Sequence, residues 1–245
     1  MGSNLACIGL DVADQEGLTV LIARTSRDSH RSDVAGGVTV NRWEDPSGAV
    51  LVINRRDGDL LGLLPTFGSG VGALVRDCRV FAGDLLTAEA VDADGQRICP
   101  LLLESPQFFR LAEQDRPWSG TAALTGLGVE LALYADADDY AASPDSIVSE
   151  GDDARRWAPE SLVCYGFFGE PEAATGHAHL SGTVLRAETR TNSLTGQKFV
   201  AAEVRTAGFE ITVCLPAADL PAVPQPGNVL AGTVFLIAEL EMATA

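Results

Sequence analysis

Two histidines separated by one residue have the spacing in this sequence that best suits metal chemistry. His177 and His179 point to one face if a strand begins there, because side chains alternate along a strand. Neutral imidazole is a zinc ligand, and Glu170 or Glu172 could add a carboxylate. A zinc site uses at least three protein ligands, and no third ligand follows at a recognisable spacing. We therefore predict no metal, with His177 and His179 as the candidate ligands if one binds.

Nucleophilic catalysis would need a serine or cysteine together with a base and an acid that orients the base. The chain has three histidines, and no Gly-x-Ser-x-Gly turn accompanies them. The run Gly68-Ser69-Gly70-Val71-Gly72 has a different spacing and lacks the lysine of a phosphate-binding loop. We interpret this run as a flexible connection. We predict no catalytic residue and no cofactor, and residues that would bind a cofactor stay unassigned.

The cysteines are scattered, and none lies in a Cys-x-x-Cys pair. There are five of them: Cys7, Cys78, Cys99, Cys164 and Cys214. An odd number with such spacing indicates reduced thiols that pack like small apolar side chains. A zinc site or a redox pair is the alternative.

Charge and hydropathy limit the classes of partner. The formal net charge is -17, from 34 acidic and 17 basic residues. Such a balance repels polyanions, so we expect neither nucleic acid nor an anionic membrane as a partner. The sequence has no apolar run of about 18 residues and no signal-peptide pattern after Met1, and we therefore expect a cytoplasmic protein. The hydrophobic share of 46% is enough for a sizeable core.

The elements that would position these residues are clearest between residues 179 and 240. Alternating runs from His179 to Arg190 and from Lys198 to Thr206 flank a turn that contains Asn192 and Gly196. Two further apolar runs follow, at 210–215 and 229–237. Residues 179–245 are therefore predicted to form a small β-barrel.

This barrel resembles oligonucleotide-binding (OB) barrels and looks similar to barrels of uncharacterised bacterial proteins. The similarity rests on Gly182-Thr183-Val184, Thr195-Gly196 and Pro226-Gly227-Asn228-Val229, and it implies a fold without an activity. An OB surface that binds nucleic acid combines basic grooves with aromatic side chains. Acidic residues outnumber the basic ones here, so we expect cross-strand ion pairs instead for Arg186, Arg190, Lys198 and Arg205.

The first 66 residues show the order strand, helix, strand, strand, strand. We expect a buried strand over 5–12 and a helix from Asp14, a plausible N-cap, to about Arg27. Further strands are expected at 38–43, 49–54 and 60–64.

These residues resemble one βαβββ module of the vicinal oxygen chelate superfamily, which includes glyoxalases and bleomycin-resistance proteins. The resemblance rests on the sequence from Ala6 to Val12, the helix, and the sequence from Trp43 to Leu51. It implies a histidine on the first strand and a glutamate after the turn in members that are metal enzymes. Cys7 and Val52 stand at those positions here, and neither supplies the ligands that such chemistry uses. The resemblance therefore implies a module without a metal.

The predicted fold class is α+β and predominantly β, in four segments. Residues 1–66 form the βαβββ module, 67–140 an antiparallel β section, 141–178 an acidic linker with a docking segment, and 179–245 the OB-like barrel. The apolar face of the module must be covered, either by strands between Ala73 and Tyr134 or by a second chain, and we favour the first. Both a monomer and a homodimer stay open.

The sequence favours a non-catalytic binding or protein-interaction protein whose partner is an unknown protein or small molecule. The alternative is a small-molecule-binding or enzymatic member of the chelate superfamily that uses the N-terminal concavity. A deep apolar cavity with converging polar groups would favour the alternative, and an exposed apolar patch would favour interaction.

Overall fold

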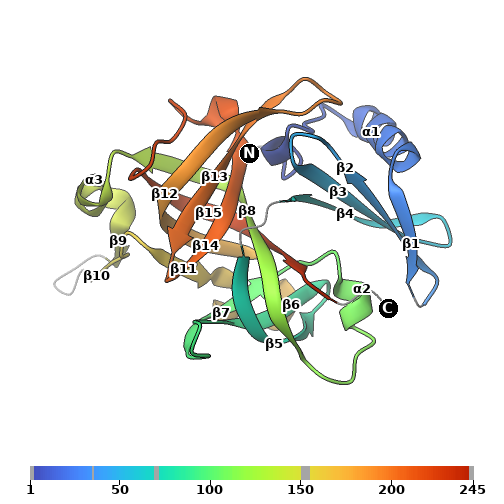
Figure 1. Cartoon of the computed structure of the whole chain (residues 1–245), viewed down its shortest axis with the longest axis horizontal. Helices are drawn as coiled ribbons and strands as arrows, with labels where there is room; N and C mark the ends of the chain where they lie inside the picture. The colour runs from blue at the N-terminus through green and yellow to red at the C-terminus, as the bar shows by residue number, and fades with distance from the viewer. Residues whose placement is uncertain (1–2, 35, 69–71, 150–154, 243–245) are drawn as a thin grey trace.

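The computed structural model describes residues 3–34, 36–68, 72–149 and 155–242 (Figure 1). Residues 69–71, the centre of the connection 68–72, lie outside the described residues, so Ser69 is not placed. The fold is mostly β with a few short helices, and the predicted class, α+β and predominantly β, is confirmed at that level.

A four-stranded antiparallel sheet follows helix α1 (Gln15–Arg27). Its strands are neighbours in chain order: β1 (His30–Val34), β2 (Val38–Glu44), β3 (Ala49–Arg56) and β4 (Asp59–Phe67). Helix α1 begins where expected, because the Asp14 carboxylate accepts a hydrogen bond of 2.8 Å from the Gly17 amide. Strand β1 is exposed and polar, and its sequence carries no alternation that would have predicted it.

The strand expected over residues 5–12 does not form. The chain there makes a 3-10 helix, η1 (Ala6–Ile8), with local bonds from the Ile8 amide to the Leu5 oxygen and from the Gly9 amide to the Ala6 oxygen. Gly9 ends the turn with a φ of 70°, which a side chain disfavours. A short apolar run shows burial without showing which element is buried, and this segment is buried against the barrel.

The barrel closes through five strands. These are β8 (Trp118–Tyr134), β12 (His177–Thr191), β13 (Lys198–Thr206), β14 (Phe209–Pro216) and β15 (Val229–Leu240). Strands β12, β13 and β14 pair in chain order, β14 pairs with β8 in parallel, and β15 joins β8 back to β12. Strand β8 lies outside the range 179–245 expected for the barrel. Its 17 residues form one continuous strand, in which Val129 is the extra residue of a bulge opposite Thr233 and Val234 of β15.

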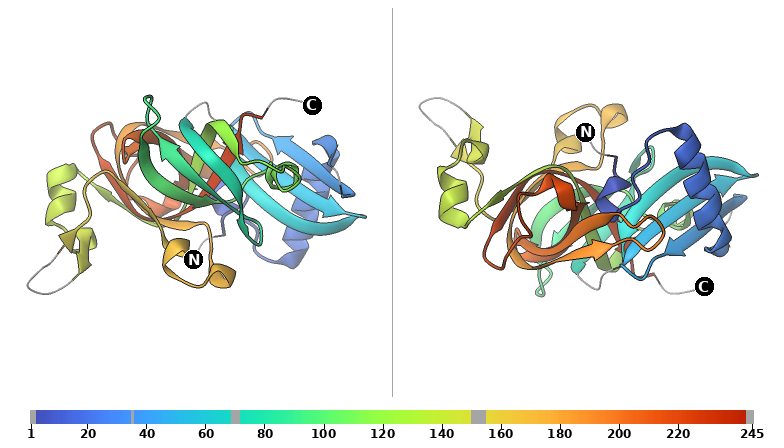
Figure 2. Two further views of the ribbon diagram at one scale, coloured as in Figure 1. Left: turned by 90° about the horizontal axis from the view of Figure 1, so that it is seen from below. Right: turned by 90° about the horizontal axis from the view of Figure 1, so that it is seen from above.

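The remaining strands extend this sheet on both sides. Strands β5 (Gly72–Ala82), β6 (Leu85–Val91) and β7 (Arg97–Leu103) continue from β8, and β11 (Ser161–Cys164) pairs with β12. The views of Figure 2 show α3 (Ala137–Ala142) at the far end of the barrel from α1. Between α3 and β11, a short hairpin forms from β9 (Ile147–Ser149) and β10 (Arg155–Arg156). Short helices complete the chain: α2 (Phe108–Leu111), η2 (Pro144–Ser146), η3 (Tyr165–Phe168), η4 (Pro171–Ala173) and η5 (Ala217–Asp219).

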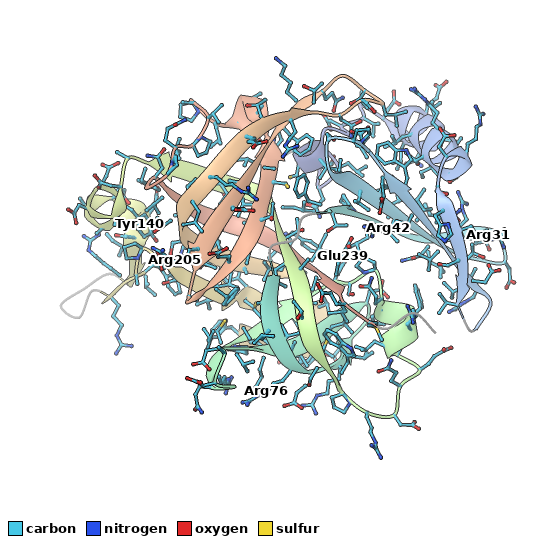
Figure 3. The ribbon with its side chains drawn as sticks, viewed as in Figure 1. Arg31, Arg42, Arg76, Tyr140, Arg205 and Glu239 are labelled. Atoms are coloured by element: carbon cyan, nitrogen blue, oxygen red, sulfur yellow. The ribbon has the colours of Figure 1, made fainter. Side chains whose placement is uncertain are left out.

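The N-terminal sheet is covered on both faces by its own chain. Asn41 donates to Ser29 just beyond the end of α1, while the next residue, Arg42, points to the opposite face and binds Glu239 of β15 (Figure 3). A buried cluster joins this sheet to the barrel through Leu127, Phe199, Cys214, Phe235 and Ile237. The middle section therefore contributes Leu127 of β8, and the C-terminal strands contribute the other four residues.

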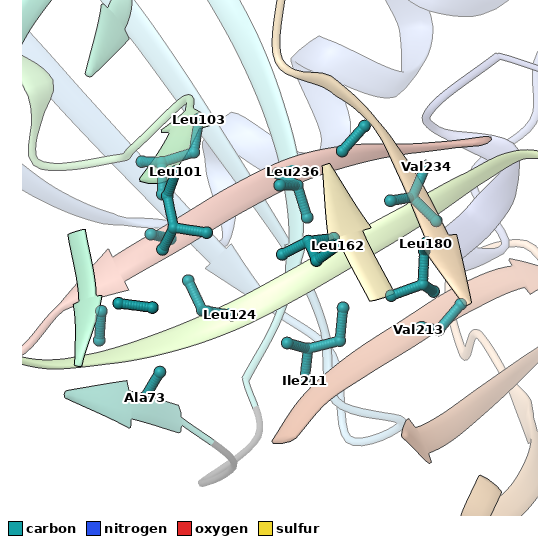
Figure 4. Packing of buried hydrophobic residues seen from close by; sticks show 14 of the residues in the cluster. Ala73, Leu101, Leu103, Leu124, Leu162, Leu180, Ile211, Val213, Val234 and Leu236 are labelled. Atoms are coloured by element: carbon teal, nitrogen blue, oxygen red, sulfur yellow. The ribbon is translucent and has the colours of Figure 1, made fainter. Parts of the chain in front are cut away.

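A second cluster fills the barrel and the space between it and β5, β6 and β7. Figure 4 shows side chains from many strands converging there, among them Leu101, Leu124, Leu180 and Val234. These side chains are at most 2% exposed. The barrel interior is therefore a packed core.

Candidate binding cleft

His177 and His179 lie at the start of β12, where each packs against an aromatic ring. His177 contacts Phe235 edge-on, and its Nδ1 is 2.8 Å from Thr175 Oγ1. His179 is 6% exposed and stacks on Trp157 at 4.4 Å, and burial lowers its pKa to about 4. Among the described residues, no group of three or more histidine, cysteine or acidic side chains is placed to hold a metal.

The five thiols are free, and four of them are buried. The prediction of reduced thiols that pack like apolar side chains is confirmed for Cys7, Cys78, Cys164 and Cys214. Burial raises the pKa of Cys7 to about 12, and its Sγ donates to the Gly128 oxygen at 3.2 Å. A neutral thiol is a poor nucleophile and a poor metal ligand.

The structure places Cys7 and Val52 on elements of different kinds. Cys7 lies in the 3-10 helix and not on a strand of the N-terminal sheet. Val52 is 1% exposed in the centre of β3 and belongs to the cluster that joins the sheet to the barrel. Val52 also borders a hollow of about 140 Å³ with Arg42 and His30, so the barrel does not fill the whole of that face.

A cleft of about 350 Å³ lies between the edge of β4 and helix α2. One wall is apolar, with Leu61, Leu63 and Leu64 of β4 opposite Phe108 and Phe109 of α2. Polar groups from three segments complete the lining: Asn54, Arg56, Asp84, Glu104 and Ser105. Aromatic and aliphatic walls with a few polar groups are typical of a small-molecule or peptide site.

Glu104 is the residue in this cleft with the clearest chemical character. It follows β7, and its backbone is fixed by hydrogen bonds from its amide to Leu236 and from the Ala238 amide to its oxygen. Burial, with a smaller effect of Asp84, raises the pKa of the Glu104 carboxyl to about 7. No described residue forms an ion pair with it. A partly buried carboxyl without a cation can accept a proton or a ligand cation near neutral pH.

Two more polar groups of the cleft could contact a ligand. Asn54 Oδ1 is buried and has no hydrogen-bond partner in the part of the chain that the structure describes. Arg56 is exposed at the end of β3 and makes no ion pair within the same described ranges. A buried acceptor without a donor costs about 1–3 kcal/mol, so a ligand donor that reaches Asn54 Oδ1 would recover part of that cost.

Glu104 and Asp84 also border a second hollow of about 220 Å³, formed with residues near η4. On the other side of α2, Phe109 borders a smaller hollow of about 140 Å³ that includes Arg42 and His30. The cleft is thus the centre of a series of depressions along the junction between the N-terminal sheet and the rest of the molecule.

Another hollow, of about 360 Å³, lies between the β2–β3 turn and the outer face of β12 and β13. Its charged groups are already paired. Arg186 of β12 binds Glu203 of β13, a cross-strand ion pair of the predicted kind, and Arg190 binds Glu188 at 2.8 Å. Because these charges neutralise one another, this hollow offers less to a charged ligand than the cleft does.

The sequence analysis missed the cleft. Its residues come from segments that are up to 55 residues apart, from Asn54 to Phe109, and spacing does not show that they meet. One local signal existed: Glu104 directly follows the apolar run 101–103, which is fully buried, and two phenylalanines follow it. A charged residue at the end of a buried strand is a candidate for a perturbed pKa.

Comparisons of the chain with protein-family models, with curated proteins and with solved structures find no match. None of the helices in the described ranges is long and apolar enough to cross a membrane.

Proposed function

We propose that the protein is a non-catalytic binding protein whose ligand occupies the cleft between β4 and α2. The observation that carries this proposal is the Glu104 carboxyl, which is partly buried and unpaired beside the apolar wall of Phe108 and Phe109. A chain that keeps an uncompensated carboxyl at the junction of two layers loses stability there, and a ligand donor or cation offsets that loss.

Binding fits the cleft better than catalysis does. Ser105 is the hydroxyl that lines it, and Ser105 Oγ donates to Gln107 at 3.0 Å, so no described base activates it. Glu104 and Asp84 are the two carboxyls of the lining, and no histidine, cysteine, lysine or tyrosine among the described residues lines the cleft with them.

The alternative function is that of a small-molecule-binding or enzymatic member of the chelate superfamily. Its ligand would also bind in this cleft. The barrel packs against the face of the N-terminal sheet that such a protein would use and leaves a hollow of about 140 Å³ there. Asn54, Arg56 and Leu63 line the larger cleft at the edge of the sheet. We therefore assign the ligand to the cleft between β4 and α2 and not to the centre of the sheet face.

We also propose that the barrel is OB-like and does not bind nucleic acid. In OB barrels the second and third strands carry the binding face. Counted from β12, these strands are β13 and β14, and their outward residues Phe199 and Cys214 are buried beneath the N-terminal segment. The chain itself covers the surface that a single strand would need, and the net charge of -17 opposes such binding.

The test is a screen of small organic amines and amides by ligand-observed NMR against the full chain, followed by variants. We expect at least one saturable ligand whose binding Glu104→Gln and Phe109→Ala weaken by about tenfold. Phe168→Ala is the matched control, because Phe168 is 78% exposed and lies outside the cleft. Ligands that bind equally to all three variants, or no ligand at all, would contradict the proposal.

A further inference from the structure

Strand β4 is an open edge beside the cleft. The N-terminal sheet has the order β1-β2-β3-β4, so β4 has a partner on one side. Its C-terminal half approaches the barrel, where Thr66 lies 3.3 Å from Thr125, but its N-terminal half borders the cleft. Unpaired amides and carbonyls at such an edge are a template for another strand.

The register shows which backbone groups are free. The Gly68 amide bonds to the Gly48 oxygen, and pairs alternate along an antiparallel ladder. The hydrogen-bonded pairs are therefore Thr66 with Val50, Leu64 with Val52 and Gly62 with Asn54. The backbone groups of the residues between them point away from β3, and those of Leu63 point towards the cleft.

Two features limit the free edge to a short stretch. Pro65 has no amide hydrogen to offer, which is a common way to block an edge strand. Toward the other end, Leu61 is the extra residue of a β-bulge in β4, because Asn54 pairs with Gly62 while Arg55 pairs with Leu60. The free edge between this bulge and Pro65 is thus short and centred on Leu63, and Leu60 and Leu61 are more than 40% exposed although they are leucines.

The opposite wall of the cleft determines which side chain fits. Glu104 and Asp84 form no ion pair among the described residues, while Phe108 and Phe109 offer apolar contact. Arg56 lines the cleft from the end of β3. A strand laid along β4 directs alternate side chains into the cleft. A basic side chain there would have its methylenes against the phenylalanines and its charge against the carboxylates.

We propose that an extended peptide segment adds to β4 as a fifth strand and places a lysine or arginine side chain against Glu104 and Asp84. This inference rests on the proposed function, because it names the class of ligand for the same cleft. Main-chain bonds supply affinity and the acidic pocket supplies specificity, as in other cases of strand addition. Charge complementarity selects a basic segment over a second copy of this chain, since both copies would carry the same net charge of -17.

The test measures binding of labelled pentapeptides to the full chain by fluorescence anisotropy. The probe has the capped sequence threonine-valine-lysine-valine-threonine, and matched probes carry norleucine or glutamate in place of the lysine. A fourth probe is N-methylated at both valines, which removes amide hydrogens without changing charge. We expect binding of the lysine probe to exceed that of the norleucine and glutamate probes by about tenfold or more, and the N-methylated probe to lose about tenfold.

Two changes to the protein test the same contacts, the outward amide of Leu63 and the carboxylate of Glu104. Leu63→Pro removes an outward amide hydrogen without breaking a hydrogen bond to β3. Leu63→Ala is the control, because this variant also loses the leucine side chain but keeps the amide hydrogen. We expect Leu63→Pro to bind the lysine probe about tenfold more weakly than Leu63→Ala. Glu104→Gln should reduce the preference for lysine over norleucine. If Leu63→Pro does not fold, the N-methylated probe still decides the question.

Three results would overturn the inference. The first is no binding by any probe at millimolar concentration, and the second is binding that N-methylation leaves unchanged. The third is a concentration-dependent dimer that Leu63→Pro abolishes, which would assign the edge to a second copy. If peptides fail while small amines bind in a manner that depends on Phe109, the inference falls and the proposed function stands.

Discussion

Arg42 of β2 holds Glu239 of β15 with two hydrogen bonds, from its two terminal nitrogens to the two carboxylate oxygens, at 2.7 and 3.2 Å. The two side chains are 28% and 19% exposed, so the pair is mostly sheltered from water. It joins the N-terminal sheet to the last strand of the barrel, close to the bridge between Glu104 and Ile237. The junction that forms the cleft is therefore fixed by a paired charge on one side and left with an unpaired charge on the other.

Glu239→Gln should lower the free energy of unfolding by about 1.5–3 kcal/mol, because it removes the more sheltered of the two carboxylates that Arg42 binds and leaves only the exposed Glu44. Asp33→Asn is the control, since Arg31 and Asp33 form an ion pair whose side chains are 65% and 73% exposed. The control should change the same quantity by less than about 1 kcal/mol. Urea unfolding at pH 7 measures both changes. Equal effects would show that the Arg42–Glu239 pair stabilises the fold no more than an exposed ion pair does.

Gly9→Ala should destabilise the docking of the N-terminal segment on the barrel. A Cβ at Gly9 would lie 2.9 Å from Asn192 Cβ and 3.0 Å from the Gln197 oxygen, in the β12–β13 loop that binds this segment. Gly95→Ala is the matched control, because Gly95 has a φ of 77° and open space around it. We expect Gly9→Ala to cost about 1–3 kcal/mol more than the control in urea unfolding. A difference near zero would contradict the packing described for this loop.

His179 should make the protein less stable in mild acid. Burial lowers its pKa in the folded protein to about 4 from the ordinary 6.5, so below pH 6.5 the unfolded chain binds a proton that the folded chain does not. This contribution to stability is complete above pH 6.5 and is lost progressively as the pH falls toward 4. His179→Phe keeps a ring to stack on Trp157 and cannot titrate. The variant should show a smaller loss of unfolding free energy between pH 7 and 5, and an unchanged loss would contradict this role for His179.

Glu104 should make the protein less stable as the pH rises, which is opposite to the effect of His179. Its pKa rises to about 7 from the ordinary 4.5, so between these values the unfolded chain is ionised while the folded carboxyl keeps its proton. The contribution of this group to stability is present below pH 4.5 and is lost as the pH rises through 7. Glu104→Gln should therefore stabilise the unliganded protein at pH 8 relative to the wild type, and more so than at pH 5. Urea unfolding at the two pH values measures this, and Glu113→Gln serves as a control on an exposed carboxyl.

Local patterns in the sequence predicted local structure well. The pattern Asp45-Pro46-Ser47-Gly48 predicts a turn with proline at its second position, and this turn forms, since the Gly48 amide bonds to the Asp45 oxygen at 2.8 Å and Gly48 has a φ of 91°. The expected N-cap at Asp14 also forms, as does the hairpin turn that the pair Asp94-Gly95 predicts. These features depend on residues that are close in sequence, where side-chain chemistry and φ preferences act directly.

The pairing of distant segments was harder to predict. Nothing in the sequence of β8 shows that it will pair with β14 in parallel and with β15 as well, because an apolar strand suits several neighbours equally. The cleft was missed for the same reason. Glu104 has one local signal, its place after the apolar run 101–103. Its raised pKa comes from burial beside β4 and from Asp84, which only the fold brings together.

The most direct test of the binding cleft is a backbone amide NMR titration of the full chain with the tightest ligand from the amine or peptide sets. The account predicts saturable shift changes centred on residues 61–64 of β4 and 104–109 around α2, with the Glu104 carboxyl resonance responding at the same ligand concentration. Shift changes centred instead on the outer face of β12 and β13, around Arg186 and Glu203, would contradict it.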